Sequence, residues 1–307
     1  MTTNAGGSRL GLQIPTVFGD DKPSGADLIA WCRRAEELGF GSIWAAERIL
    51  HQHPQAHMMT ALTYAAAATT RVQLGTAVLL LNLHSPVEVA QQTATLQHLS
   101  GGRLVLGVSL GGRDDEYAVT NVSTEHRVGR LEEGMRLMRR LWTERDVSMK
   151  GRYFNVEAAN VSLKPSPAIP MLIGGAAEPS LRRAGRIADG WVQGSRGTPE
   201  SFAKGWALVQ EGATAAGRDP STLITAKLLS ANPGTDRDKA RSELQAVREA
   251  YYGPGFPMDQ TAYGPAKEMA AMVRSFMDAG CQTVVLGLPD LDLGRLEATA
   301  ELIPLVV

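Results

Sequence analysis

The stretch 170–191 carries the clearest chemical signal in the sequence. It consists of an apolar strand, the glycine pair Gly174 and Gly175, an arginine-bearing helix and a second strand that contains Trp191. A glycine pair between a strand and a helix lets the backbone approach a ligand closely, and it aims free amides and the positive end of the helix at an anion. The segment predicts a phosphate site, although the glycine pair alone also fits a plain tight turn.

Two further segments have residues suited to chemistry. Glu47 and Arg48 follow a predicted strand, and Gly111, Gly112 and Arg113 follow another. Proton carriers are few, and we find neither a Ser-His-Asp set nor a nucleophile elbow. A large flat ligand with a phosphate fits these segments better than hydrolysis does.

A metal centre is the rival interpretation, because His51-Gln52-His53 resembles the His-x-His of metal-dependent amidohydrolase barrels. All 6 histidines precede the predicted fifth strand, so the ligands that such a site needs after later strands do not exist. We therefore expect no metal and interpret these histidines as exposed loop residues. A proton-donor role for one histidine stays open.

Composition narrows the function classes. The chain has 307 residues, 44% of them hydrophobic, and a net charge of −1, which gives no electrostatic case for nucleic acid or an anionic membrane. No apolar run is long enough to span a bilayer. Cys32 and Cys281 lack metal spacing and are expected to be buried, reduced thiols of a cytoplasmic protein.

Hydrophobic periodicity predicts strands that alternate with helices along nearly the whole chain. The expected strands cover residues 10–14, 42–46, 72–79, 103–109, 171–173, 190–193, 223–230 and 283–288. Eight such units predict a single α/β domain over 1–307, a (β/α)8 barrel. A short strand pair within 146–163, after the fourth helix at 124–142, and a loop at 251–262 interrupt the rhythm. A doubly wound open sheet is the alternative, but no Gly-x-Gly-x-x-Gly follows the first strand.

In such barrels, chemistry takes place at the carboxyl ends of the strands. The residues just after each predicted strand are therefore the candidates for the site. They include Glu47, Arg48, the segments 79–84 and 111–117, and the turn 174–177.

The order and spacing of these pieces resemble the luciferase-like monooxygenase superfamily of flavin- and deazaflavin-dependent barrels. The resemblance covers nearly the whole chain. It is carried by the segments 35–44, 71–78, 86–103, 106–108, 130–143 and 173–191. The family implies a reduced-flavin-type cofactor in the barrel mouth, used for hydride transfer or for oxygen activation.

The resemblance also implies roles for individual residues. Gly174, Gly175, Ala176 and Ala177 would hold the cofactor phosphate through backbone amides. Ala77 and Val78 would lie under the ring, joined by a cis peptide bond. Gly111 and Gly112 would line the side of the cofactor tail, with Arg113 near its charges, and Trp191 would form a pocket wall.

The chain departs from the family pattern at two places. Deazaflavin members typically carry Asp-His or Glu-His where this chain has Glu47-Arg48, and arginine is no acid or base near neutral pH. We expect Glu47 to pair with Arg48 and to orient it against the ring or substrate, or else to form a salt bridge at the rim. Proton transfer then falls to Glu47, to a loop histidine or to solvent. After the fourth strand, Gly111 and Gly112 replace the basic residue of luciferases and the acid of some sugar-phosphate dehydrogenases, which argues against both activities.

Coenzyme F420 is the favoured cofactor, because the open glycine mouth at 111–112 suits a long anionic tail. Hydride transfer with a small organic substrate follows from it. One alternative is a monooxygenase that uses flavin mononucleotide (FMN) from a partner flavin reductase; another is a non-catalytic cofactor-binding barrel, which the missing histidine at position 48 supports. A bacterial homodimer is expected in each case.

Overall fold

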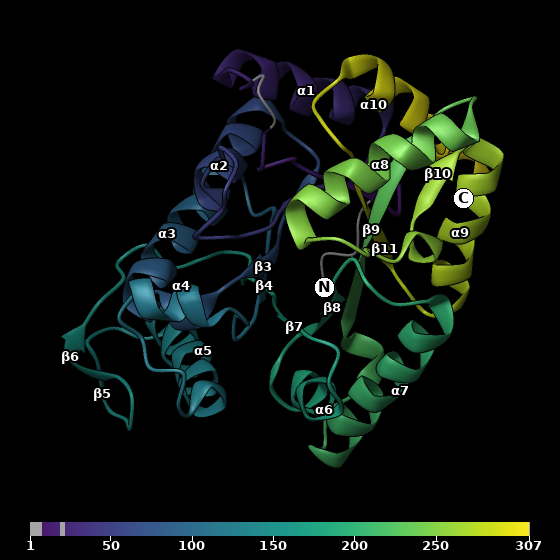
Figure 1. Cartoon of the computed structure of the whole chain (residues 1–307). Coiled ribbons are helices and arrows are strands. Elements are labelled where there is room, and N and C mark those ends of the chain that lie inside the picture. Colours follow the sequence, from purple (N-terminus) through teal and green to yellow (C-terminus); the bar gives the residue numbers. More distant parts are fainter. Residues whose placement is uncertain (1–7, 19–21, 307) are drawn as a thin grey trace.

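A closed parallel barrel forms the centre of the molecule in this computed structural model, which describes residues 8–18 and 22–306 (Figure 1). Its strands are β1 (Leu10–Gln13), β2 (Ser42–Ala45), β3 (Gln73–Leu79), β4 (Leu104–Val108), β7 (Met171–Gly174), β8 (Gly190–Gln193), β9 (Ile224–Pro233) and β11 (Thr283–Gly287). In the barrel, each of β1, β2, β3, β4, β7 and β8 pairs with the next in this order. The barrel closes because β8 pairs with β9, β9 with β11, and β11 with β1. The predicted barrel is confirmed.

Helices cover the outside of this barrel. They are α1 (Gly25–Leu38), α2 (Met58–Ala68), α3 (Pro86–Leu99), α4 (Asp114–Val119), α5 (Arg127–Thr143), α6 (Glu178–Ile187), α7 (Pro199–Ala215), α8 (Arg237–Tyr252), α9 (Ala266–Asp278) and α10 (Leu293–Ala300). The first shows why these segments are helical: Ser24 and Asp27 form a capping box, Trp31 and Ala35 are buried on one face, and Gly39 ends the helix at φ 97°. No helix in the described ranges is long and apolar enough to cross a membrane.

The barrel interior below the mouth is filled by Trp44. A Cβ at Gly75 would lie 2.2 Å from its indole ring, so glycine is the residue that leaves room for it. The indole Nε1 donates to Ser42 Oγ at 2.8 Å, which satisfies the buried N–H. Around it pack Ala77, Val105, Leu172, Val192, Ala226, Leu228 and Val285. This floor leaves the carboxyl ends of the strands as the open end of the barrel.

The predicted insertions are partly confirmed. Antiparallel strands β5 (Val147–Lys150) and β6 (Asn155–Ala159) form the expected pair and project away from the barrel (Figure 1). The helix expected over 124–142 is wrong at its start: it begins at Arg127, after the short helix α4 that the sequence did not predict.

The loop expected over 251–262 is also shorter than predicted. Helix α8 continues through Tyr252 and ends where Gly253 takes φ 86°. After it, β10 (Ala262–Gly264) adds to the edge of β9. The rings of the two tyrosines pack together, with centroids 4.5 Å apart. The glycines and prolines that break the helix come only after them.

Candidate active site

Glu47 lies just past β2 and is anchored to the segment that follows β3. Its backbone N–H donates to Val78 O at 3.3 Å, and its Oε2 accepts from Leu80 N at 2.6 Å. The side chain is only 3% exposed. A carboxylate so buried needs partners for both oxygens, and the second partner is a histidine.

That histidine is His84, whose Nε2 lies 2.8 Å from Glu47 Oε1. Burial lowers the pKa of His84, but the hydrogen bond and charge of Glu47, with the charge of Glu88, outweigh burial and raise the pKa above its ordinary value of 6.5. The imidazole is 27% exposed, so part of the ring is accessible to solvent. The sequence placed His84 in the segment after the third strand but gave no sign of its partner.

Arg48 does not pair with Glu47, so the expected pair is wrong. The guanidinium instead donates from Nη1 to Tyr251 O at 2.7 Å, and its Cζ lies 4.7 Å from the centroid of the Tyr251 ring. Burial and the neighbouring Tyr252 raise the pKa of Tyr251 to about 12, although Arg48 and Arg248 oppose the shift. The reason for the error is orientation, since the two consecutive side chains reach different segments of the mouth.

The peptide bond between Ala77 and Val78 is cis, as the family resemblance predicted. Ala77 is 4% exposed and belongs to the barrel interior. The Val78 side chain contacts the predicted glycine turn, because a Cβ on Gly174 would lie 2.8 Å from Val78 Cγ1. The ends of β3 and β7 therefore meet beside the end of β4, which lies between them in the barrel.

The turn from Gly174 to Ala177 presents backbone to the mouth. Gly175 has φ +152°, and a Cβ there would lie 2.5 Å from Ser180 Oγ, so only glycine fits. Ala176 and Ala177 are exposed and precede helix α6 directly. Among the described residues we find no acceptor for the N–H of either alanine. The turn thus offers free amides at the start of a helix, which is an arrangement that suits an anion.

Trp191 has a different place from the predicted pocket wall. It is 1% exposed, and its ring stacks on Phe202 with centroids 4.8 Å apart, between barrel and helices. Its Nε1 donates to Gly175 O at 2.8 Å. Alternation along β8 explains the error: Val192 points into the barrel, so Trp191 points outward. Trp191 supports the glycine turn from behind.

The two glycines after β4 differ in their surroundings: other side chains cover Gly111, and Gly112 has open space around it. Gly111 has φ +76° and lies under Tyr117, whereas a Cβ on Gly112 would meet nothing within 4 Å. Arg113 donates from Nε to Asp115 Oδ1 at 3.0 Å, so a neighbouring carboxylate already balances its charge. Glu116, which the sequence did not single out, accepts from the N–H of Ile49 at 2.9 Å and joins this segment to the one after β2.

The segments after β2 and β4 and the end of α8 enclose a cavity of 600 Å³ at the rim of the barrel, whose lining does not include Glu47, His84 or the turn 174–177. Its ionisable lining consists of Arg48, His51, His53, Arg113, Asp115, Glu249, Tyr251 and Tyr252. Burial, then the charges of Arg48 and His53, lower the pKa of His51, which indicates a locally positive environment. Among the described residues, no group of three or more His, Cys, Asp or Glu is arranged to hold a metal.

A buried lysine, which the sequence analysis did not select, fixes the segment after β8. Lys227 is 0% exposed, and its Nζ donates to Gly194 O at 2.5 Å and to Arg196 O at 3.1 Å. Burial lowers its pKa to about 7. The sequence did contain a sign of this buried lysine, because Lys227 is the one charged residue in the strand 224–233.

Comparison with known proteins agrees with this geometry. Residues 7–285 match the model of the luciferase-like monooxygenase family. An F420-dependent glucose-6-phosphate dehydrogenase of Kineococcus radiotolerans is 29% identical over 89% of this chain and 90% of its own. An F420-dependent hydroxymycolic acid dehydrogenase of Mycobacterium tuberculosis is 33% identical over 70% of this chain and 61% of its own. A solved F420-dependent secondary alcohol dehydrogenase, in complex with an F420-acetone adduct, superposes with a TM-score of 0.87 at 24% identity, covering 98% and 99% of the two chains.

Proposed function

This chain belongs to the luciferase-like monooxygenase family, and from that premise we propose that it is an oxidoreductase that uses coenzyme F420 for hydride transfer with a small organic substrate. The F420-dependent relatives support the choice of cofactor over FMN. Their substrates are not carried over, because Gly111 and Gly112 replace the acid that some sugar-phosphate dehydrogenases have after β4.

The mouth fits such a cofactor. The free amides of Ala176 and Ala177 would hold its phosphate, beside a turn that no side chain at Gly175 could share. Ala77 and Val78 would lie under its ring, with Gly174 beside Val78. Gly111, Gly112 and Arg113 would border the tail, and Arg48 would add positive charge at the rim.

A deazaflavin, when bound, supplies two-electron hydride chemistry and activates oxygen poorly. The protein's part is then to move the accompanying proton. His84 is the group we assign to this step, with Glu47 as its positioning residue. Because Nε2 faces Glu47, the proton would be exchanged at Nδ1, for which no partner is found among the described residues.

The contact between Glu47 and His84 is the observation that carries this proposal. It supplies from the segment after β3 the imidazole that the family usually places at position 48. The non-catalytic interpretation rested on that missing histidine and loses its main support.

We also propose a homodimer formed through α2 and α3. Helix α2 (Met58–Ala68) contains no charged residue, and α3 has only Glu88 and His98. Tyr64 is 42% exposed and Leu99 71% exposed on this face. A cytoplasmic location is proposed with it, supported by the free, buried thiols of Cys32 and Cys281.

The test is turnover with oxidised F420 and a panel of small alcohols with and without a carboxylate group, followed through the visible absorbance of the cofactor. His84→Gln should lower kcat by about 100-fold or more without weakening F420 binding, because the proton would have no acceptor. His126→Gln, on an exposed histidine that lies outside the rim cavity and the proposed dimer face, is the matched control and should leave turnover unchanged. Turnover by His84→Gln at the wild-type rate would remove the assignment of His84, and an absence of turnover on the whole panel with F420 bound would support the non-catalytic barrel.

A further inference from the structure

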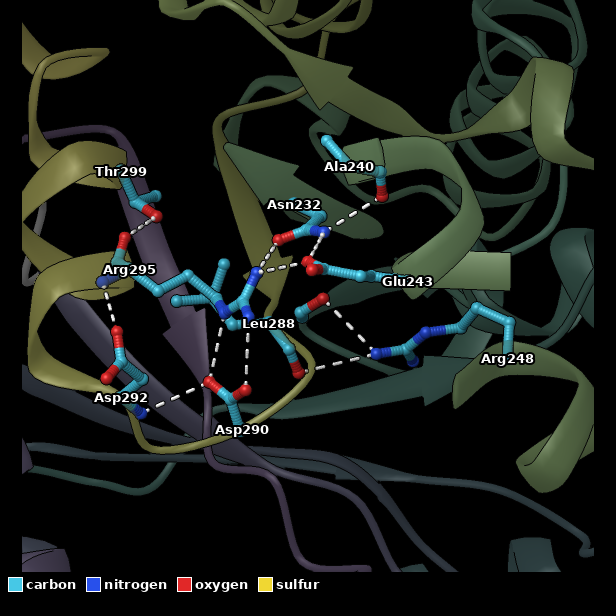
Figure 2. Close-up of polar contacts among 10 residues, drawn as sticks. Asn232, Ala240, Glu243, Arg248, Leu288, Asp290, Asp292, Arg295 and Thr299 are labelled. Carbon is cyan, nitrogen blue, oxygen red and sulfur yellow. Dashed lines mark hydrogen bonds and ion pairs between the residues drawn. The ribbon is translucent and has the colours of Figure 1, made fainter. Parts of the chain in front are cut away.

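Arg248 is a buried arginine whose hydrogen bonds are largely unmade. The residue is 8% exposed, and its Nη2 donates to Gly287 O at 3.3 Å and to Leu288 O at 3.4 Å, both long (Figure 2). Its buried Nε has no partner, and no hydrogen bond from Nη1 is found in the described part of the chain. Burying a guanidinium without an anion is unfavourable, so the group calls for an acceptor that the described part of the chain, residues 8–18 and 22–306, does not provide.

A neighbouring arginine shows the contrast. Arg295 has its nitrogens engaged by Asp290, by Glu243 and by Asn232 (Figure 2). This network joins α10 to β9 and to the first half of α8, and so it fixes the helix from which Arg248 extends. Among the described residues Arg248 forms no ion pair, so helix α8 sets the position of its guanidinium.

The guanidinium reaches the mouth of the barrel. A Cβ on Gly287, at the carboxyl end of β11, would lie 3.9 Å from both Nη1 and Nη2 and 3.2 Å from Gln13 Oε1. Gln13 ends β1, and no hydrogen bond of its side chain is found among the residues described. The side chain of Gln13 and the unpartnered Nε and Nη1 of Arg248 thus meet at the edge where β1 and β11 adjoin.

They line a cavity of 150 Å³. Apart from Gln13, Arg248, Thr16, His53 and Tyr251, its described lining is mainly apolar, with Phe18, Val247 and Leu288 among it. His53 and Tyr251 also line the 600 Å³ rim cavity, so the two cavities adjoin. A small apolar body with one planar anionic group matches this combination.

We propose that Arg248 binds a carboxylate of the substrate and that the chain therefore acts on small organic acids. The proposal rests on the function proposed above and names its substrate class. The guanidinium offers N–H donors to a carboxylate, the amide nitrogen of Gln13 can add a further donor, and the apolar lining takes the hydrocarbon part. Arg248 is not among the site residues predicted from the sequence.

The experiment is calorimetric titration of the full chain with butyrate, with the uncharged isostere butyramide and with inorganic phosphate, each with and without F420. Butyrate should bind more tightly than both others. Arg248→Met should weaken butyrate binding by about tenfold or more, and Arg248→Lys should weaken it less, because lysine keeps the charge but loses the planar fork. Arg241→Ala, on an exposed arginine of the same helix, should not change it.

Several results would overturn the proposal: equal affinity for butyrate and butyramide, tighter binding of phosphate, or wild-type butyrate affinity in either Arg248 variant. Circular dichroism checks that each variant is folded, and Arg248→Lys keeps the test decisive if Arg248→Met does not fold. Loss of F420 affinity in a folded Arg248 variant would assign the residue to the cofactor and also overturn it. Butyrate binding without any F420 binding would instead contradict the proposed function and leave the carboxylate site standing.

Discussion

Glu47 Oε1 and His84 Nε2 lie 2.8 Å apart, joining the end of β2 to the segment after β3. The side chain of Glu47 is 3% exposed, and Leu80 N–H takes its other oxygen. This contact turns a histidine that is unremarkable in the sequence into the best-placed proton carrier of the barrel mouth.

The pKa of His84 should depend on Glu47. In Glu47→Gln the carboxylate charge is lost while burial stays, so the pKa of His84 should fall below its wild-type value. Because the folded pKa is raised, His84 contributes stability that is fully present below about pH 6.5 and lost as pH rises through the folded pKa. NMR titration of labelled histidine measures both proteins. An identical His84 pKa in the two would show that Glu47 is not what raises it.

Arg48 should act through its charge. With F420 as cofactor, Arg48→Ala should slow hydride transfer severely and Arg48→Lys only in part, because lysine keeps a cation at the rim. Single-turnover kinetics separate this step from binding. Wild-type rates in both variants would mean that the contact with Tyr251 only joins the rim to α8.

Lys227 should impose a pH dependence on stability. Its folded pKa of about 7 lies below the ordinary value of 10.5, so the folded state binds fewer protons than the unfolded state between these values. The free energy of unfolding should therefore gain from this group as pH rises from about 7 toward 10.5. Lys227→Met should reduce that gain, measured by urea denaturation across this range. An unchanged pH profile would contradict the burial of a titrating ammonium.

The amide of Ala177 offers a test of the phosphate site that leaves the fold intact. Gly175 suits this purpose poorly, because its φ of +152° strains any side chain there. Ala177 has φ −73°, which proline adopts, so Ala177→Pro removes one N–H at little conformational cost. It should weaken F420 binding by about tenfold, with an unchanged Tm of the cofactor-free protein. Wild-type affinity would exclude this amide from the phosphate site.

Much of the fold could be predicted because it repeats a local pattern. Strand and helix periodicity predicted the barrel and the strand pair within 146–163, and both are present. The turn at Gly174 and the cis peptide bond at Ala77 were also predicted, the first from residue type and the second from the family resemblance.

The direction of individual side chains could not be predicted. Consecutive residues Glu47 and Arg48 reach different partners, and Trp191 faces the helices rather than the mouth. Arg248 was missed because its significance is that no carboxylate pairs with it among the described residues, which only the folded arrangement of α8 beside β11 reveals. Such contacts join segments 37 to 203 residues apart, a range at which sequence spacing carries no information.

The proposed function depends on F420 binding at the barrel mouth. Titration of the cofactor-free protein with oxidised F420 and, in parallel, with FMN measures this binding directly through the absorbance of each ring. We expect saturable binding of F420, at least about tenfold tighter than that of FMN. Tighter binding of FMN, with oxygen-dependent turnover once a flavin reductase supplies the reduced form, would contradict it.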